Sequence, residues 1–290
     1  MANSKWTQLI GERHGAFLQQ SVEVIQRVES VYERRAKAQI SAFETEMIAS
    51  VTEGREPNWE LFDFSDLFMR HMLDTCISAI QIAETEQELI TKPPTHLAMF
   101  PRIKLPRSMR ELMDMWDRIR RKPQFNRRAK DLADRVRKDY LRKIQRAWYR
   151  NTDAYRNGDE ATKQRALDNI RRSCKAPQAR VKTIVETETT RYNNQTRKGI
   201  YDELDAVTHY LFLAVRDMAT TPWCKTRTGL VYEKTDPLCD EETPPIHWNC
   251  RSEMVPLTPQ NPKHLRLIRD KSKQRRNHKC APLPRGWRKG

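Results

Sequence analysis

A turn followed by a short β-type run lies in TTPWCKTRTGLVY, residues 220–232. A second such run, residues 250–255, falls inside PPIHWNCRSEMVPL, residues 244–257, and a longer apolar run, HYLFLAVRD at 209–217, precedes both. Short apolar runs bounded by turn signals are typical of β-strands. The sequence therefore predicts a small domain with short strands in this part of the chain, with a proline- and acid-rich loop at 235–249.

Upstream of this domain the composition favours helix. The chain has only eight glycines, and nine of its sixteen prolines follow residue 220. The first expected helix carries an apolar stripe at steps of three and four residues, which is typical of a core face but also of a face that docks on another subunit. Helices are expected over residues 5–50, 66–90, 108–121, 126–150 and 151–174, and from about 177 to 204.

The predicted fold class is mainly α, with long N-terminal helices, a small α+β C-terminal domain and a disordered or extended basic tail. Four segments are expected. They are a helical hairpin region at 1–95, a basic helical region at 96–175, the C-terminal domain at 176–258 and the tail at 259–290. The tail has few large apolar residues, so it is not expected to fold alone.

The charge is strongly uneven. The whole chain carries a net +16, which divides into −6 over 1–95, +15 over 96–180, −3 over 181–259 and +10 over 260–290. Basic blocks favour either a phosphate backbone or acidic protein neighbours as partners. The residues expected to contact DNA are Arg127, Arg128, Arg135, Lys138, Arg142, Lys143, Arg146 and Arg150 in the helix, and Arg269, Lys271, Lys273, Arg275 and Arg276 in the tail.

The helix before the strands is unusual. Residues 183–197 read TIVETETTRYNNQTR, with five threonines and few large apolar side chains. Threonine is a mediocre helix former, so this is not a simple core helix. Its polar face is expected to pack against another polar surface.

These motifs together resemble the phage-Mu-F-like minor head proteins, a head-morphogenesis family. That signature has a Thr-rich helix with a T-E-T core, then a turn of the form T-x-x-C-x-x-x-x-G, and then P-P-x-H-x-N-C-R. Here the matching residues are Thr187-Glu188-Thr189, Thr220 to Tyr232, and Pro244-Pro245-Ile246-His247-Trp248-Asn249-Cys250-Arg251. The resemblance covers residues 178–257. Many members have cysteines at the positions that Arg227 and Ser252 occupy here.

The resemblance implies a minor capsid protein of the virion, acting in the head interior near the portal vertex after synthesis in the host cytoplasm. Its implied partners are the portal protein, other head proteins and packaged double-stranded DNA, with effects on DNA packaging or ejection. In this scheme the N-terminal hairpin docks on a head or portal protein, while the basic segments face the genome. No signal peptide or membrane span is expected from the sequence.

A set of soft ligands stands out in the same region. Cys224, Cys239, His247 and Cys250 are the residue types that bind structural zinc, which requires four ligands. Alternatives remain open, because the cysteines could be buried thiols, with His247 bonded to a loop carbonyl, or could take a redox role. Pro244 and Pro245 are expected to hold the loop extended, so that His247 and Cys250 point inward.

Arg251 is expected to face the opposite side from Cys250. If it is buried it needs a carboxylate, and Glu188 and Glu186 on the Thr-rich helix are the candidates.

Catalysis is not expected. The serious alternative is a metal-dependent nuclease that uses the His247 and cysteine cluster. Hard cations in nucleases are held by carboxylates, however, and the acids at 240–242 look like a solvated loop. A plain DNA-binding regulator is a further alternative, although the basic helix lacks the short turn and paired recognition helix of such proteins.

Overall fold

The fold is described from a computed structural model, which covers residue 10, residues 12–91, 124–214 and 219–284. The chain divides into two compact units. Of the described residues, those within 10–28, 74–91 and 186–284 form one unit, the sheet unit, and those within 29–73 and 124–185 form the other, the helical unit. The boundaries of the two units differ from those of the four segments expected from the sequence. Three long helices, Glu12–Glu53, Ser65–Thr91 and Gln178–Asp202, each contribute residues to both units.

The mainly α fold class is confirmed. Helix α2 spans Glu12–Glu53, α3 Ser65–Thr91, α5 Gln124–Asn157, α6 Glu160–Lys175 and α7 Gln178–Asp202. A 3-10 turn, η1, lies at Trp59–Leu61 between α2 and α3. The helix expected at 108–121 lies outside the described residues. No described helix is both long enough and apolar enough to cross a membrane.

In the helical unit the apolar stripe of α2 is buried by other helices of the same chain. Tyr32, Phe43 and Met47 are each about 1% exposed or less. Trp148 of α5 donates its indole N–H to Ser50 Oγ at 3.0 Å. A third helix thus seals the stripe, which two helices alone could not do.

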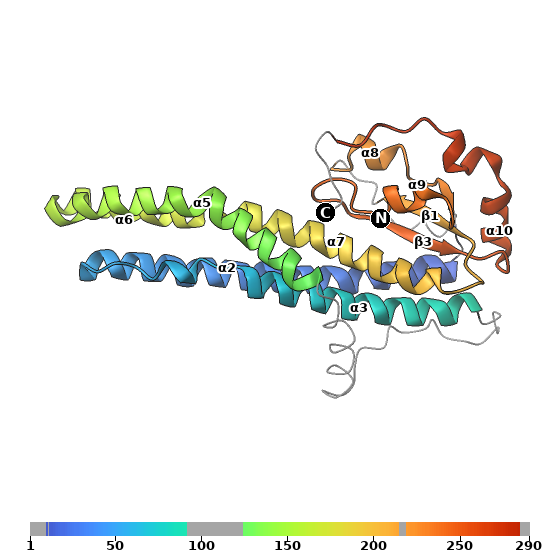
Figure 1. Cartoon of the computed structure of the whole chain (residues 1–290), viewed down its shortest axis with the longest axis horizontal. Helices are drawn as coiled ribbons and strands as arrows, with labels where there is room; N and C mark the ends of the chain where they lie inside the picture. The colour runs from blue at the N-terminus through green and yellow to red at the C-terminus, as the bar shows by residue number, and fades with distance from the viewer. Residues whose placement is uncertain (1–9, 11, 92–123, 215–218, 285–290) are drawn as a thin grey trace. The chain divides into compact units, whose positions relative to one another are not determined.

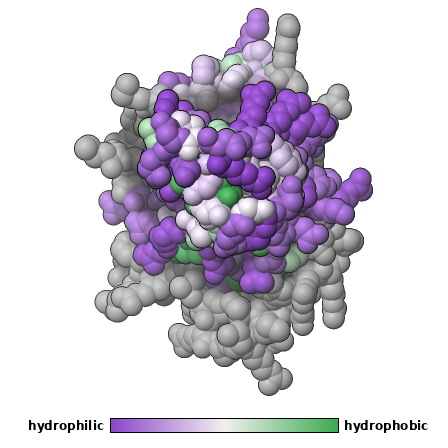
Figure 2. Space-filling model, turned by 90° about the vertical axis from the view of Figure 1, so that its left-hand side faces the viewer, coloured by the Kyte–Doolittle hydropathy of each residue, from purple (hydrophilic) through white to green (hydrophobic). Residues whose placement is uncertain are grey.

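Helices α5 and α6 form an antiparallel hairpin within this unit (Figure 1). Asp159 caps α6 by accepting from the backbone N–H of Thr162, at the predicted break after Asn157. The face of the helical unit that Figure 2 turns to the viewer is largely hydrophilic.

The sheet unit contains three antiparallel strands in the order β2-β1-β3. β1 spans His209–Ala214, β2 Val231–Glu233 and β3 Ser252–Leu257. β1 follows the expected run as far as Ala214, and the rest of that run lies outside the described residues. β2 is shorter than expected, and β3 is shifted two residues onward. The segment at 235–249, expected to be loop, contains the short helix α9, Pro237–Glu242, and α8 covers Pro222–Lys225.

Apolar residues cover both faces of the sheet, because side chains alternate along a strand. On one face Tyr210 and Phe212 of β1 join a core with Tyr232 and Met254. On the other, Leu211 and Leu213 join Phe17 and Leu18 of α2 and Leu267. A sheet that is buried on both faces must be covered by elements outside the three strands. The part of helix α2 before residue 28 is one of these elements.

The basic tail holds more regular structure than its composition suggests. Helix α10 spans Pro262–Arg269, and the 3-10 turns η2 and η3 cover Lys271–Lys273 and Arg275–Asn277. Gln274 forms a parallel bridge with Val231 of β2. The tail is therefore ordered by packing on the sheet unit, consistent with a segment that cannot fold by itself.

Candidate functional site

The Thr-rich helix α7 lies along the outer edge of β3 and hydrogen-bonds to its backbone. Asn194 donates from Nδ2 to the carbonyl of Ser252 at 3.0 Å and accepts at Oδ1 from the N–H of Met254 at 2.8 Å. Its amide thus takes the place of a neighbouring strand. Exposed strand edges invite pairing with other chains, and this side chain closes the edge.

Two threonines of α7 extend the same contact toward the turn before β3. Thr187 Oγ1 accepts from the backbone N–H of Asn249 at 3.0 Å, and Thr190 donates to the carbonyl of Cys250. Asn249 has φ 56°, a left-handed conformation that asparagine tolerates better than most residues. The polar surface that the helix was expected to meet is therefore the backbone of the 249–254 segment.

Glu188 is fully buried and pairs with Arg191, whose Nε lies 3.2 Å from its carboxylate. Arg251 is exposed. The burial considered for Arg251 is therefore not found, and the buried arginine beside Glu188 is Arg191. An i,i+3 pair on one helix explains this, since it forms without any tertiary approach. A pairing of Arg251 with Glu188 or Glu186 stays a prediction.

Three of the four expected ligands converge. The Sγ of Cys224 lies 3.1 Å from His247 Nε2 and 3.8 Å from the Sγ of Cys250, and all three ligand atoms lie within 4.8 Å of one another. We call these three residues the thiol–imidazole cluster. Helix α8 carries Cys224, while the turn before β3 carries the other two.

A backbone carbonyl sets the ring orientation of His247. Its Nδ1 lies 2.6 Å from the carbonyl oxygen of Trp248, which can only accept, so Nδ1 carries the proton. Nε2 is then left to face the Cys224 sulfur and the Thr221 hydroxyl, which lies 2.9 Å away. This is the arrangement of a histidine whose second nitrogen is available as a ligand.

The two thiols differ in acidity. Burial raises the pKa of Cys250, but its contacts with the Cys224 and His247 side chains outweigh burial, so its pKa lies well below the usual range. The pKa of Cys224 is raised, first by its contact with the Cys250 sulfur and then by burial. Cys250 has no exposed surface, so a bulky substrate cannot reach it as a nucleophile.

Cys239 is not part of the cluster. It is fully buried in α9, and burial raises the pKa of its thiol to about 12. Pro244 and Pro245 are buried and joined by a cis peptide bond. The chain thus offers three soft ligands in the described residues rather than the four that the sequence suggested.

Arg227 and Ser252 occupy positions where many members of the family have cysteine, and both make hydrogen bonds within the fold. Arg227 donates to Glu242 at 2.8 Å, and Ser252 donates its hydroxyl to the Cys224 sulfur at 3.1 Å. Glu242 is buried and also accepts from Tyr232 at 2.7 Å, so the expectation that the 240–242 acids form only a solvated loop was wrong for this residue.

The expected DNA-contacting residues of α5 are mostly exposed. Arg128 is half-buried, and the other seven lie on the surface: Arg127, Arg135, Lys138, Arg142, Lys143, Arg146 and Arg150. Helix α5 as a whole carries eleven basic and four acidic residues. The surface is therefore basic along most of its length.

The tail cations differ from one another. Arg269 and Lys271 are exposed and Lys273 is half-buried. Arg275 is used inside the fold, where it binds Glu242, and Arg276 bonds Asp236 at 2.6 Å. The guanidinium of Arg275 is thus bonded within the fold, and its expected contact with DNA stays a prediction.

A buried charged network in the sheet unit had no sequence signal. Glu86 of α3 pairs with Arg197 of α7 at 2.7 Å and with His14 of α2 at 2.5 Å, and Tyr201 also donates to it. Arg197 is 1% exposed and makes a second ion pair, with Glu253. Burial raises the pKa of Glu86, but Arg197, His14 and Tyr201 outweigh burial and lower it to about 2.

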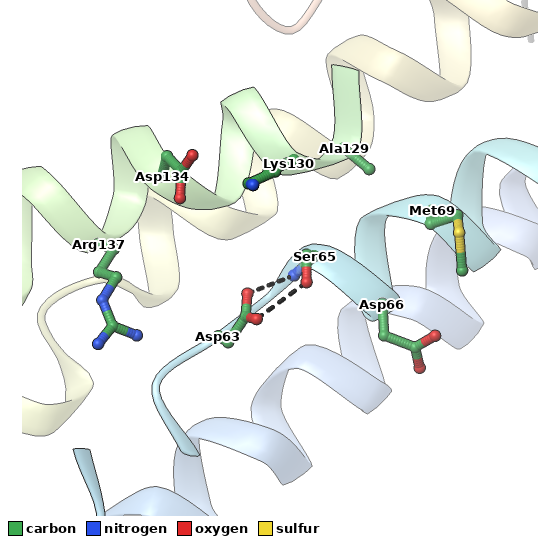
Figure 3. Close-up of a pocket in the computed structure, with 8 residues that line it drawn as sticks. All are labelled: Asp63, Ser65, Asp66, Met69, Ala129, Lys130, Asp134 and Arg137. Atoms are coloured by element: carbon green, nitrogen blue, oxygen red, sulfur yellow. Dashed lines mark hydrogen bonds between the residues drawn. The ribbon is translucent and has the colours of Figure 1, made fainter. Parts of the chain in front are cut away.

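An open pocket of about 450 Å³ lies in the helical unit, between the start of α3 and α5 (Figure 3). Asp63 in this pocket accepts hydrogen bonds from the N–H and hydroxyl of Ser65. The pocket also mixes acidic and basic side chains, and none of its carboxylates belongs to a close group of possible metal ligands in the described residues. It therefore suggests no chemistry of its own.

The chain was compared with known protein families, curated proteins and solved structures. Residues 124–255 match the family described as "Phage Mu protein F like protein". The match begins in α5, well upstream of the motifs at 178–257, and so includes the basic helix. No curated protein and no solved structure matches the chain. Over residues 124–255, somewhat less than half of its length, the chain is similar to the phage Mu protein F-like family, and this similarity supports a role in phage head morphogenesis.

Proposed function

We propose that the protein is a minor structural component of the phage head, which sits inside the head near the portal vertex and contacts packaged double-stranded DNA. Its partners in this scheme are the portal protein and other head proteins, and it affects DNA packaging or ejection. The role is structural rather than catalytic. The family supports a place in head assembly, and the basic face of α5 supports the contact with DNA.

The observation that carries the DNA contact is the exposed basic row on α5. Lys138, Arg142, Arg146 and Arg150 recur at steps of four residues and are all exposed. Residues four apart lie on the same side of a helix, so these four cations form one continuous stripe. A phosphate backbone, with its regular negative charge, is the partner that such a stripe fits without base-specific contacts.

Salt dependence of DNA binding tests this proposal. Each phosphate contact adds about 0.9 to the negative slope of log affinity against log salt. Reversing Arg142, Arg146 and Arg150 to glutamate should therefore reduce the slope by about 2.7, measured by fluorescence anisotropy with a random-sequence duplex. A matched control reverses Arg34, Arg35 and Lys37, three exposed cations of α2.

Both triple variants change the net charge equally, so a general charge effect would weaken DNA binding in both. Loss in the α5 variant alone supports the proposal. Equal losses, or binding that does not respond to salt, would contradict it. Placement near the portal needs a separate test, in which cross-linked heads are analysed for adducts between this protein and the portal protein. Adducts with the major capsid protein alone would contradict that placement.

A further inference from the structure

The thiol–imidazole cluster has the geometry of a metal site. We propose that Cys224, His247 and Cys250 bind one zinc ion, with a water molecule as the fourth ligand. The site acts to hold helix α8 against the turn before β3. This inference concerns the fold of the sheet unit and does not depend on where the protein sits in the head.

The sulfur–sulfur distance fits zinc. Zn–S bonds of about 2.3 Å in a tetrahedron place two sulfurs about 3.8 Å apart, and the sulfurs of Cys224 and Cys250 are 3.8 Å apart. A sulfur and an imidazole nitrogen on the same ion lie about 3.6 Å apart, against 3.1 Å between Cys224 and His247. The ring therefore needs to move back by about 0.5 Å, a small adjustment for a side chain in the turn before β3.

The imidazole is already in the tautomer that a metal requires. The Trp248 carbonyl holds the proton on Nδ1, which directs the lone pair of Nε2 toward Cys224. Ligating histidines in zinc sites usually donate their other N–H in this way, because the second bond fixes the ring. The Trp223 ring, 5.6 Å from the His247 ring between centroids, adds a packing contact on the same side chain.

A small pocket beside the cluster supplies the fourth position. Its volume is about 10 Å³, on the order of one water molecule, and Cys224 and His247 both line it. The hydroxyls of Thr221 and Ser252 also line it, and they lie 2.9 Å from His247 Nε2 and 3.1 Å from the Cys224 sulfur. A water in this pocket would have two hydroxyl partners in addition to the ion.

The ligand types select a soft metal. Two thiolates and one imidazole suit zinc, whereas magnesium and calcium prefer oxygen ligands. Cys224 and Cys250 come from segments that no strand pairing joins. A bridge through an ion therefore stabilises a part of the unit that has no ladder hydrogen bonds of its own.

Metal content of the whole chain tests the proposal. The protein is purified under reducing conditions, dialysed against metal-free buffer and analysed by inductively coupled plasma mass spectrometry. We expect about one zinc per chain. We also expect Co²⁺ added to the zinc-depleted chain to give thiolate-to-cobalt charge-transfer absorption and the intense visible bands of a tetrahedral site.

The variants Cys224→Ser, Cys250→Ser and Cys239→Ser separate a specific site from non-specific thiol binding. Cys239→Ser is the matched control, because Cys239 is equally buried but lies outside the cluster. It should retain the metal, while the other two should lose it. His247→Cys keeps a soft ligand and should still bind cobalt with an added thiolate band, which guards against a variant that merely fails to fold.

Two results would overturn the proposal. One is a folded wild-type chain that holds no zinc and gives no cobalt spectrum in the presence of reductant. The other is a Cys224–Cys250 disulfide in protein purified from the cytoplasm, detected as two thiols that resist alkylation until reduced. In that case the pair is a redox element and not a metal ligand set.

Discussion

Arg275 donates hydrogen bonds from Nε and Nη2 to both carboxylate oxygens of Glu242, each 2.7 Å long. The two residues are 33 positions apart, and the bond fastens the basic tail to helix α9. Bidentate arginine–carboxylate pairs are among the strongest polar contacts in proteins. The carboxyl of Glu242 has its pKa lowered to about 2, since hydrogen bonds from Arg275, Arg227 and Tyr232 outweigh the effect of burial.

Removing this contact should destabilise the sheet unit. We expect Arg275→Ala to lower the free energy of unfolding by about 2 kcal/mol, less than the about 3–5 of a fully buried pair, because Arg275 keeps some exposure. Urea unfolding followed by circular dichroism measures it. Arg269→Ala, at an exposed tail position, is the control and should change stability by less than about 0.5 kcal/mol. Equal effects would show that the pair contributes nothing specific.

The amide of Asn194 should be essential for the edge of β3. Asn194→Ala leaves the Ser252 carbonyl and the Met254 N–H without partners. We expect a loss of about 2 kcal/mol and faster hydrogen exchange at the Met254 amide. Gln195→Ala, next along the helix and exposed, should leave both unchanged. Protection at Met254 that survives Asn194→Ala would contradict the role assigned to this amide.

Stability should fall as the pH drops from 6.5 toward 3, through His264. Its Nδ1 accepts from the backbone N–H of Thr258, and its Nε2 lies 3.2 Å from His14 Nδ1. Burial, with a smaller effect of His14, lowers the pKa of His264 to about 3. The unfolded chain therefore binds more protons than the folded chain in this range, so acid favours unfolding.

The measurement is urea unfolding between pH 7 and pH 5, a range above that in which Glu86 and Glu242 titrate. His264→Gln should be less stable at pH 7 but should lose less stability on acidification than the wild type. His278→Gln, at an exposed histidine, should follow the wild type. A pH dependence that His264→Gln leaves intact would assign the effect to another group, such as His71, whose burial also lowers its pKa to about 3.

Arg197 should tolerate neither alanine nor lysine. Alanine leaves Glu86 and Glu253 as buried carboxylates without their cation, at a cost of about 3–5 kcal/mol. Lysine keeps the charge but cannot reach both carboxylates from one planar group. Thermal unfolding of Arg197→Ala and Arg197→Lys, with the exposed Arg266→Ala as control, tests this. A lysine variant as stable as the wild type would show that charge alone suffices.

Much of the organisation could be predicted from local patterns. Steps of three and four apolar residues located α2, α3 and α5, and the break near Asn157 was confirmed by the Asp159 cap. The motifs around Cys224 and Cys250 pointed to the family that residues 124–255 match, and the sequence predicts that Cys224, His247 and Cys250 meet. The DNA contact and the bound metal stay predictions.

The sequence by itself determined the helices, the short strands and the family, because periodicity, turn residues and motif spacing are local properties of the chain. Only the tertiary structure decided which polar groups meet. The spacing of Glu86, Arg197 and Glu253 in the sequence does not predict that they form ion pairs. The basic composition of the tail likewise does not predict that Arg275 binds Glu242 while Arg269 stays exposed. Such pairings depend on which elements pack together. A buried charge loses its hydration at a high free-energy cost, so the fold must supply a partner for it.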